Sequence, residues 1–433
     1  QGKTSVFKAQ LRILPSVAFI SAFLNNTPVV VIFAPIIKHW AKSVNLPATK
    51  FLIPLSYVTI LGGICTLIGT STNLVVHGMI LEAGFEGFSM FELGKVGIFI
   101  AIAGIIYIFL FSKRLLPDAR PDTAVPDEEV EEGEKLHRVE AVLGARFPGI
   151  NKKLKDFNFQ RHYGAEVKEI KTRNGQRFVS NLEEVVLHEG DTLVVMADDT
   201  FIPTWGESSV FVLLTNGNEP DTTGKKKKRW FALLLLVLMI VGATVGELPI
   251  TKEMFPDIKL DMFFFVSITT IVMAWTNLFP ARKYTKYISW DILITIACAF
   301  AISKAMVNSG VADSVAKFII GLSDDYGPHV LLAMLFIITN LFTELITNNA
   351  AAALAFPLAL SIAAQLGVSP TPFFVVICMA ASASFSTPIG YQTNLIVQGI
   401  GNYKFMDFVR IGLPLNIITF IISVILIPMI WNF

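Results

Sequence analysis

The stretch FLNNTPVVVIFAP at residues 23–35 returns in altered form as LITNNAAAALAFP at 345–357. Each copy is followed by a second motif, TLIGTSTNLVV at 66–76 and STPIGYQTNLIV at 386–397. In both halves an Asn-rich triplet interrupts one apolar segment, and a Gly-x-x-Thr-Asn element interrupts the next. Polar backbone breaks in membrane-length segments are costly unless they line a cavity or bind a ligand. The duplication therefore predicts an inverted-repeat transporter, in which re-entrant hairpins and broken helices meet near the bilayer midplane.

The composition indicates a mainly α membrane protein. Hydrophobic residues make up 53% of the 433 residues, charged residues only 16%, and the mean hydropathy is +0.60. Ordinary soluble domains do not combine these values. The three cysteines, Cys65, Cys298 and Cys378, show no CxxC spacing. Neither a disulfide framework nor a zinc site is therefore expected.

Charged residues concentrate between Lys113 and Arg229, which indicates a polar insert between two membrane halves. We divide the chain into a first transport repeat, an acidic linker, a small α/β domain, a basic linker and a second transport repeat, at 1–112, 113–137, 138–215, 216–229 and 230–433. Three long apolar runs precede the second triplet but not the first. We therefore expect the N-terminal helices of the first repeat to be missing, because the sequence is a truncated or partial form of a longer transporter; a natural half-repeat is the alternative.

Each repeat is predicted to contain a re-entrant hairpin, a discontinuous helix and a closing span. In the first repeat these are the hairpin arms 12–24 and 28–37, the helix 51–81 and the span 93–112. In the second they are the arms 328–346 and 350–366, the helix 371–400 and the span 410–431. The Asn-rich triplets would form the hairpin tips.

Basic residues flank the insert on both sides, as Lys113-Arg114 and as the run 225–229. The positive-inside rule then places the insert, 113–229, in the cytoplasm and the C-terminus outside. We expect a multi-pass protein of the cell (inner) membrane with the lipid bilayer as its surroundings.

The insert has the pattern of a small α/β domain. RVEAVLG at 138–144 and TLVVMA at 192–197 indicate strands, INKKLKDFNF at 150–159 indicates a helix, and Asn174-Gly175 is a strong hairpin signal. The stretch 138–200 resembles the C-terminal domain of RCK (TrkA-C) proteins. The residues that carry this resemblance are Phe147-Pro-Gly, the Tyr163-Gly-Ala turn and 187–193. It implies a dimerisation module, hence a homodimer, and leaves open whether the domain binds a nucleotide or nothing.

The duplicated motifs resemble those of the divalent anion:sodium symporter family. In that family each hairpin tip carries a Ser-Asn-Thr triplet and each broken helix a Thr-Pro-Pro-Asn-like loop. This chain departs from the pattern: both triplets lack the Ser, and both loops lack the prolines. Carried over by position, the resemblance implies anion-binding residues Asn25, Asn26, Thr27, Thr347, Asn348, Asn349, Gly69 and Gln392. It implies sodium ligands at Ser21, Asn26, Gly69, Thr70, Asn73, Thr343, Asn348, Gly390 and Asn394.

The chemistry of these residue types supports the same function. Sodium needs oxygen ligands, which hydroxyls, amide oxygens and carbonyls at a helix break supply. An anion needs donors, which amide NH2 groups, hydroxyls and the positive ends of half-helices supply. Neither motif contains Arg, Lys or His. A divalent anion would therefore depend on bound Na+ for charge compensation, which gives a physical reason for coupling.

The sequence predicts a sodium-coupled symporter of a divalent anion that works by alternating access. Sulfate is our first substrate and dicarboxylate the second. A proton-coupled antiporter that uses Glu344 and an RCK-regulated ion channel are further alternatives, and the Asn and Thr side chains could also serve only to hold helices together. An enzyme is not supported, because no nucleophile, base and orienting group can be assembled from these motifs. We expect no nucleic-acid partner.

Overall fold

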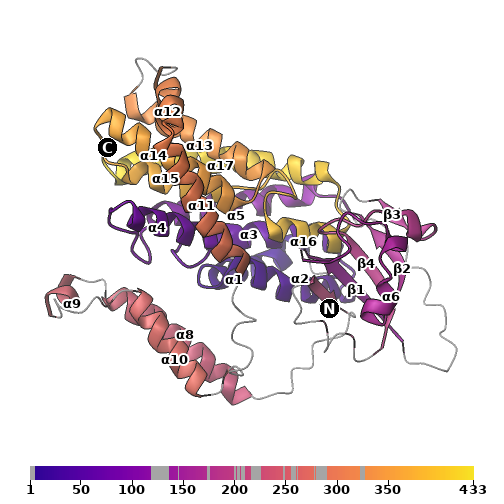
Figure 1. The fold of residues 1–433 in the computed structure, drawn as a ribbon. Helices are drawn as coiled ribbons and strands as arrows, with labels where there is room; N and C mark the ends of the chain where they lie inside the picture. The colour runs from indigo at the N-terminus through magenta and orange to yellow at the C-terminus, as the bar shows by residue number, and fades with distance from the viewer. Residues whose placement is uncertain are drawn as a thin grey trace.

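The fold is mostly helical, with one small sheet near its middle in sequence (Figure 1). The protein is represented by a computed structural model. It describes residues 5–118, 136–144, 146–172, 176–198, 201, 205, 210–215, 226–246, 249–254, 260, 262–276, 278, 290–321 and 327–433.

The first repeat forms a helical hairpin, a broken helix and one long helix. Its elements are α1 (Val6–Ser21), α2 (Asn26–Ser43), α3 (Leu52–Gly63), α4 (Ser71–Glu82) and α5 (Gly94–Leu115). The hairpin turn lies earlier in the chain than the predicted tip at 25–27. Residues 22–25 make the turn, and Asn26 already begins α2, because the Asn25 side chain accepts from the Thr27 amide at 3.3 Å and caps the helix.

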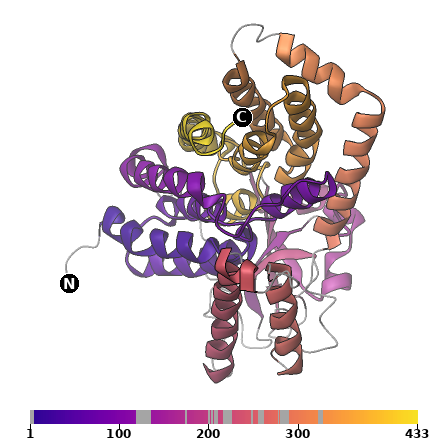
Figure 2. The same cartoon turned by 90° about the vertical axis from the view of Figure 1, so that its left-hand side faces the viewer.

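The second repeat follows the same plan, and five helices precede it in the described part of the chain. They are α8 (Lys226–Gly246), α9 (Pro249–Met254), α10 (Met262–Trp275), α11 (Trp290–Asn308) and the amphipathic α12 (Val311–Gly321). The repeat itself comprises α13 (Gly327–Leu345), α14 (Asn348–Leu366), α15 (Thr371–Ser382), α16 (Gln392–Gly401) and α17 (Phe405–Ile430). In both views α8 and α10 run beside each other and project from the other helices (Figure 2).

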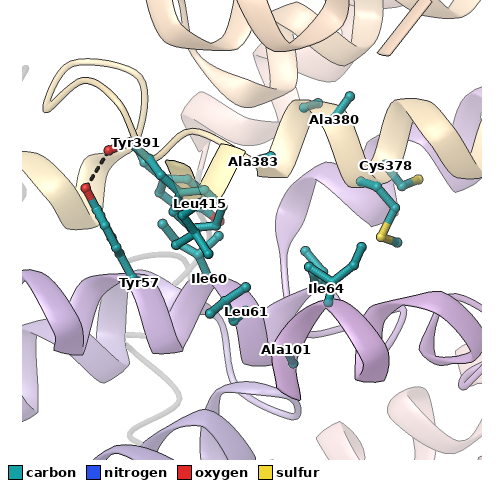
Figure 3. Close-up of a cluster of buried hydrophobic side chains, with 14 of the residues drawn as sticks. Tyr57, Ile60, Leu61, Ile64, Ala101, Cys378, Ala380, Ala383, Tyr391 and Leu415 are labelled. Atoms are coloured by element: carbon teal, nitrogen blue, oxygen red, sulfur yellow. Dashed lines mark hydrogen bonds between the residues drawn. The ribbon is translucent and has the colours of Figure 1, made fainter. Parts of the chain in front are cut away.

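Four of the described helices are long and apolar enough to cross a membrane: α5, α13, α14 and α17. Shorter apolar helices accompany them, including α3 and α15, which are almost wholly buried by other protein segments. Figure 3 shows where α3 and α15 face each other across the core, with Ile60 and Leu61 on one side and Ala380 and Ala383 on the other. These features indicate an integral membrane protein.

The two repeats pack in the same internal order and then cross. α1 packs on α3 as α13 packs on α15, and α3 packs on α5 as α15 packs on α17. Across the repeats, α2 packs on α16, and α14 packs on α4. The returning arm of each hairpin therefore lies against the second half of the broken helix of the other repeat. Every described contact between a hairpin tip and the opposite break depends on this crossing.

The insert contains a five-stranded sheet in the order β3-β2-β4-β1-β5. The strands are β1 (His137–Leu143), β2 (Glu166–Lys171), β3 (Arg177–Phe178), β4 (Thr192–Ala197) and β5 (Phe211–Thr215), and each neighbouring pair is antiparallel. The predicted Asn174-Gly175 hairpin turn lies outside the described residues.

The prediction of a helix at 150–159 is wrong. That segment contains a 3-10 turn, Leu154–Asp156, and a short helix α6 (Phe159–Tyr163) begins only at its last residue. Asn151 has a φ of 61°, which a helix does not allow, and Asn158 caps α6. The aromatic residues of the segment instead pack on Phe147, whose ring centroid lies 4.9 Å from that of Phe157. Burial of these rings decides the local structure.

The insert packs directly on the helices of the membrane part (Figure 1). Val142 of β1 belongs to the same buried cluster as the helix cores. Gly190, before β4, faces the Leu395 side chain of α16, and Gly399 of α16 faces Thr192. Lys38 of α2 pairs with Glu140 of β1 at 3.1 Å. The sheet is thereby attached to α2 and α16 at once.

The carboxylate of Glu140 is the charged centre of this contact. Its partners are Lys38, at 3.1 Å, and Lys171, at 3.3 Å. Burial alone would raise the pKa of Glu140, but the two lysines overcome that effect and lower it to about 2. Because this pKa lies below the ordinary value of about 4.3, the ion pair contributes fully at neutral pH and is lost only as the pH falls toward 2.

We expect Glu140→Gln to lower the free energy of unfolding by about 1–3 kcal/mol, because two lysines lose their carboxylate in a buried contact. Thermal unfolding in detergent measures this, and the difference from the wild type should be constant between pH 5 and 8. Glu166→Gln is the control, since Glu166 is exposed and pairs with Lys168 at the surface. Equal melting temperatures for Glu140→Gln and the wild type would contradict this role.

Candidate functional site

Each hairpin tip contains the same pair of hydrogen-bonded side chains. The Ser21 hydroxyl donates to Asn26 Oδ1 at 2.8 Å, and the Thr343 hydroxyl donates to Asn348 Oδ1 at 2.9 Å. All four residues are buried. Oxygen atoms from the last turn of one arm and from the first residue of the next are thus brought together in both halves.

A threonine holds each helix break against its own hairpin. Thr66 and Thr387 accept from the backbone amides of Gly69 and Gly390, at 3.1 and 3.2 Å. The Thr66 hydroxyl also donates to the carbonyl of Ala22, and the Thr387 hydroxyl donates to the carbonyl of Glu344 at 2.9 Å. The two halves therefore satisfy equivalent backbone groups in the same way.

The asparagine at the end of each loop motif closes its break from the other side. Asn73 Nδ2 donates to the carbonyl of Thr66 at 2.9 Å, and Asn394 Nδ2 donates to the carbonyl of Thr387 at 3.1 Å. Their amide oxygens differ. Asn394 Oδ1 accepts from Ser56 at 2.7 Å, whereas Asn73 Oδ1 is buried without a hydrogen-bond partner among the described residues. The first half thus keeps a buried acceptor that a cation can use.

Two further hydrogen bonds link the halves in a crossed pattern. The Thr27 hydroxyl donates to Gln392 Oε1 at 3.2 Å, and the Ser71 hydroxyl donates to Asn349 Oδ1 at 3.3 Å. Each joins the first turn of a returning hairpin arm to the first residue of the opposite half-helix. Thr27, Ser71 and Asn349 are partly exposed and Gln392 is exposed, so these polar groups border the buried centre.

The tyrosine hydroxyl of residue 391 lies at the centre of the arrangement. It accepts from Asn26 Nδ2 at 2.5 Å and lies 3.0 Å from the Thr70 hydroxyl. One phenol of the second repeat therefore contacts both the hairpin tip and the helix break of the first repeat.

Helices broken in the apolar core, with hairpin tips and crossed repeats around them, match the design of secondary transporters. A sequence profile described as citrate transporter matches residues 2–367 and, in a second alignment, 257–433. Together the two matches cover nearly the whole chain. The chain belongs to the citrate transporter family. Both hairpins and both breaks fall within the matched residues.

Full-length relatives of this citrate transporter family member support the assignment. An uncharacterized transporter of Synechocystis sp. is 30% identical over 95% of this chain and 81% of its own length. A putative sulfur deprivation response regulator of Chlamydomonas reinhardtii is 28% identical over 96% of this chain and 85% of its own. The first alignment has 497 positions, more than the 433 residues here, so that relative has residues inside the aligned region that this chain lacks.

A third relative carries a transport function in its name. Sodium/sulfate cotransporter 2 of Chlamydomonas reinhardtii is 31% identical over 66% of this chain and 32% of its own length. Two of these three relatives are named as transporters, and none of the three is named as an enzyme.

The structure brings most of the sequence-predicted site residues to one place, with two of them in a capping role. Asn25 caps α2, and Thr347 accepts from the Ala350 amide at 3.4 Å and caps α14. The remaining predicted residues lie at the tips and breaks described above: Ser21, Asn26, Thr27, Gly69, Thr70, Asn73, Thr343, Asn348, Asn349, Gly390, Gln392 and Asn394.

The sequence analysis did not select three polar residues of the site. Thr66 and Thr387 stand three residues before Gly69 and Gly390, and this repeated Thr-x-x-Gly spacing was a signal for them. Tyr391 gave no such signal, because its partners Asn26 and Thr70 are more than 300 positions away in sequence.

The Gly69 position tests the close approach of backbone at the first break. A Cβ atom there would lie 2.5 Å from the carbonyl oxygen of Gly63, so we expect Gly69→Ala to lower the melting temperature of the purified protein. Gly78→Ala on α4 is the matched control, since its nearest neighbour is a ring atom of Phe300 at 3.8 Å. In that helix the change should stabilise by about 0.5–1 kcal/mol. If Gly69→Ala and Gly78→Ala changed the melting temperature in the same direction and by the same amount, the close contact between Gly69 and Gly63 would be contradicted.

Proposed function

We propose that this protein is a sodium-coupled symporter of a divalent anion, with sulfate as its substrate. The observation that carries the proposal is the buried Oδ1 of Asn73, which has no hydrogen-bond partner in the part of the chain that the structure describes, beside a helix break whose Thr66 carbonyl contacts the same side chain. An amide oxygen removed from water without a donor is costly, and Na+ at this position removes that cost. The names of the sodium/sulfate cotransporter relatives support the same ion and anion.

Two sodium cages are proposed, one in each half. The first contains Ser21, Asn26, Gly69, Thr70 and Asn73, and the second contains Thr343, Asn348, Gly390 and Asn394. Hydroxyl, amide and carbonyl oxygens suit Na+ as hard ligands. Because Asn394 Oδ1 already accepts from Ser56, the second cage needs that hydroxyl to turn away before the oxygen can coordinate an ion.

The anion is proposed to bind between the two cages. Residues 22–27 and 346–349 at the tips, and 64–70 and 383–391 at the breaks, contain no Lys, Arg or His. Charge compensation for a dianion therefore comes from bound Na+ and from the positive ends of α2, α4, α14 and α16. Asn26, Thr27, Asn348 and Asn349 supply donors. Dicarboxylate is the alternative substrate, because the family description names citrate, which is also an organic polycarboxylate.

The remaining assignments belong to the same proposal. Transport proceeds by alternating access, in which the hairpins move as a unit. The insert lies in the cytoplasm and the C-terminus lies outside. We propose that the insert is an RCK-C-like domain, and homodimer formation through it stays a prediction.

A nucleotide is not part of the proposal for the insert. One hollow of the insert has a volume of about 670 Å3, and its charged lining residues are Glu166, Glu183, Glu184 and one basic residue, Lys155. Lys155 already pairs with Glu184 at 2.6 Å. An acidic lining repels phosphate groups, so this hollow does not suit a nucleotide.

Uptake of labelled sulfate and labelled succinate into proteoliposomes that carry the full-length protein tests the proposal. We expect an inward sodium gradient to drive sulfate uptake. Asn73→Ala should raise the sodium concentration for half-maximal uptake by about tenfold, because a cage ligand is lost, equivalent to about 1.4 kcal/mol. Thr419→Ala is the control, since that buried hydroxyl donates to the Leu415 carbonyl of its own helix. Uptake that is indifferent to sodium refutes the proposal.

Proton coupling through Glu344 is the second candidate function. Its Oε1 accepts from the Ser386 amide at 2.8 Å and from Asn416 at 2.7 Å, whereas Oε2 is buried without a partner among the described residues. A proton on that oxygen would satisfy it. If sodium drives transport, Glu344→Gln should retain sodium-dependent sulfate uptake, because Gln keeps the shape and an acceptor. Loss of uptake in this variant, together with uptake by the wild type under a proton gradient without sodium, favours the proton mechanism.

A further inference from the structure

The two helix breaks are equivalent except at one position. In each repeat the break contains the sequence Thr-x-x-Gly. The next residue is Thr70 in the first repeat and Tyr391 in the second. Both are the N-cap residues of the following half-helix, and both have extended backbone, with φ and ψ of −138° and 145° for Thr70 and −130° and 132° for Tyr391. A small side chain, Thr70, and a large one, Tyr391, therefore leave the backbone at equivalent positions of the two repeats.

These two side chains meet between the hairpin tips. Their hydroxyl oxygens are 3.0 Å apart, and the phenol oxygen also accepts from Asn26 Nδ2 at 2.5 Å. Tyr391 is only 9% exposed, and Asn26 and Thr70 are almost completely buried. The aromatic ring thus occupies space that a threonine at position 391 would leave open.

The phenol also changes which donors an anion can use. Because its oxygen already accepts from Asn26 Nδ2, an anion that binds this amide shares it with the phenol. The phenol proton is left for Thr70 or for an anion oxygen. Thr27 and Asn349, on the returning hairpin arms, are partly exposed and contact the half-helices that begin at Gln392 and Ser71.

We propose that Tyr391 is the residue that limits the size of the transported anion. Its ring fills the space between the hairpin tips, so that a compact tetrahedral oxyanion fits beside its hydroxyl and a four-carbon dicarboxylate does not. This inference rests on the proposed function and specifies the substrate class of the same site. Shape excludes the longer anion, and the hydroxyl donates to the shorter one.

Two substitutions separate the ring from the hydroxyl. Tyr391→Thr reproduces Thr70 and opens the space, so the ratio of succinate to sulfate uptake should rise by at least about tenfold. Tyr391→Phe keeps the ring and removes the donor, so the KM for sulfate should rise by about tenfold while succinate stays excluded. Tyr107→Phe is the matched control, because that hydroxyl donates to the Ile411 carbonyl at 3.0 Å, away from the tips.

The measurement is the initial rate of uptake of both labelled anions into proteoliposomes under an inward sodium gradient. Each variant is reconstituted at equal protein content. An unchanged succinate-to-sulfate ratio in Tyr391→Thr overturns the proposal, as does a wild type that takes up succinate in preference to sulfate. If Tyr391→Thr does not fold, Tyr391→Phe decides alone: an unchanged KM for sulfate, or new succinate uptake, overturns it. Failure of the wild type to transport either anion with sodium refutes the proposed function instead.

Discussion

Breaks in two apolar helices impose the constraint on which the rest of this structure depends. A broken helix leaves backbone amides and carbonyls without partners, and lipid cannot supply them. Here Thr66 and Thr387 satisfy them from within each break, and the amides of Asn73 and Asn394 satisfy them from the following half-helix. Because each threonine also binds the hairpin of its own repeat, the position of the hairpin is set by the same hydrogen bonds that stabilise the break.

Crossing of the repeats turns two stabilised breaks into one site. α2 lies on α16 and α14 lies on α4, so the third residue of each triplet region meets the opposite half-helix, as Thr27 meets Gln392. The halves are still not equivalent. Asn394 Oδ1 has a donor in Ser56, whereas Asn73 Oδ1 has none among the described residues. The carbonyl bound by the break belongs to Ala22 in one half and to the acidic Glu344 in the other. The two proposed cages therefore have different competing groups and need not bind sodium equally.

The sequence was sufficient to predict the elements that repeat, because both motifs carry polar residues where hydrocarbon requires apolar ones. Hairpins and breaks follow from that argument, whereas Ser21 and Thr343, which hydrogen-bond to Asn26 and Asn348, were selected only through the resemblance to the symporter family. It failed where long-range packing decides. The predicted helix at 150–159 lost to burial of aromatic rings around Phe147, and the role of Tyr391 depends on contacts with Asn26 that no local pattern encodes.

The position of the insert follows from the same crossing. α2 begins in the site at Asn26 and reaches the insert at Lys38, about 18 Å along a helix, while α16 begins at Gln392 and faces the insert at Gly399, about 10 Å further along. The two helices also pack on each other. Each of them therefore carries a polar group of the site in its first turn, as Thr27 and Gln392 show, and contacts the sheet further along.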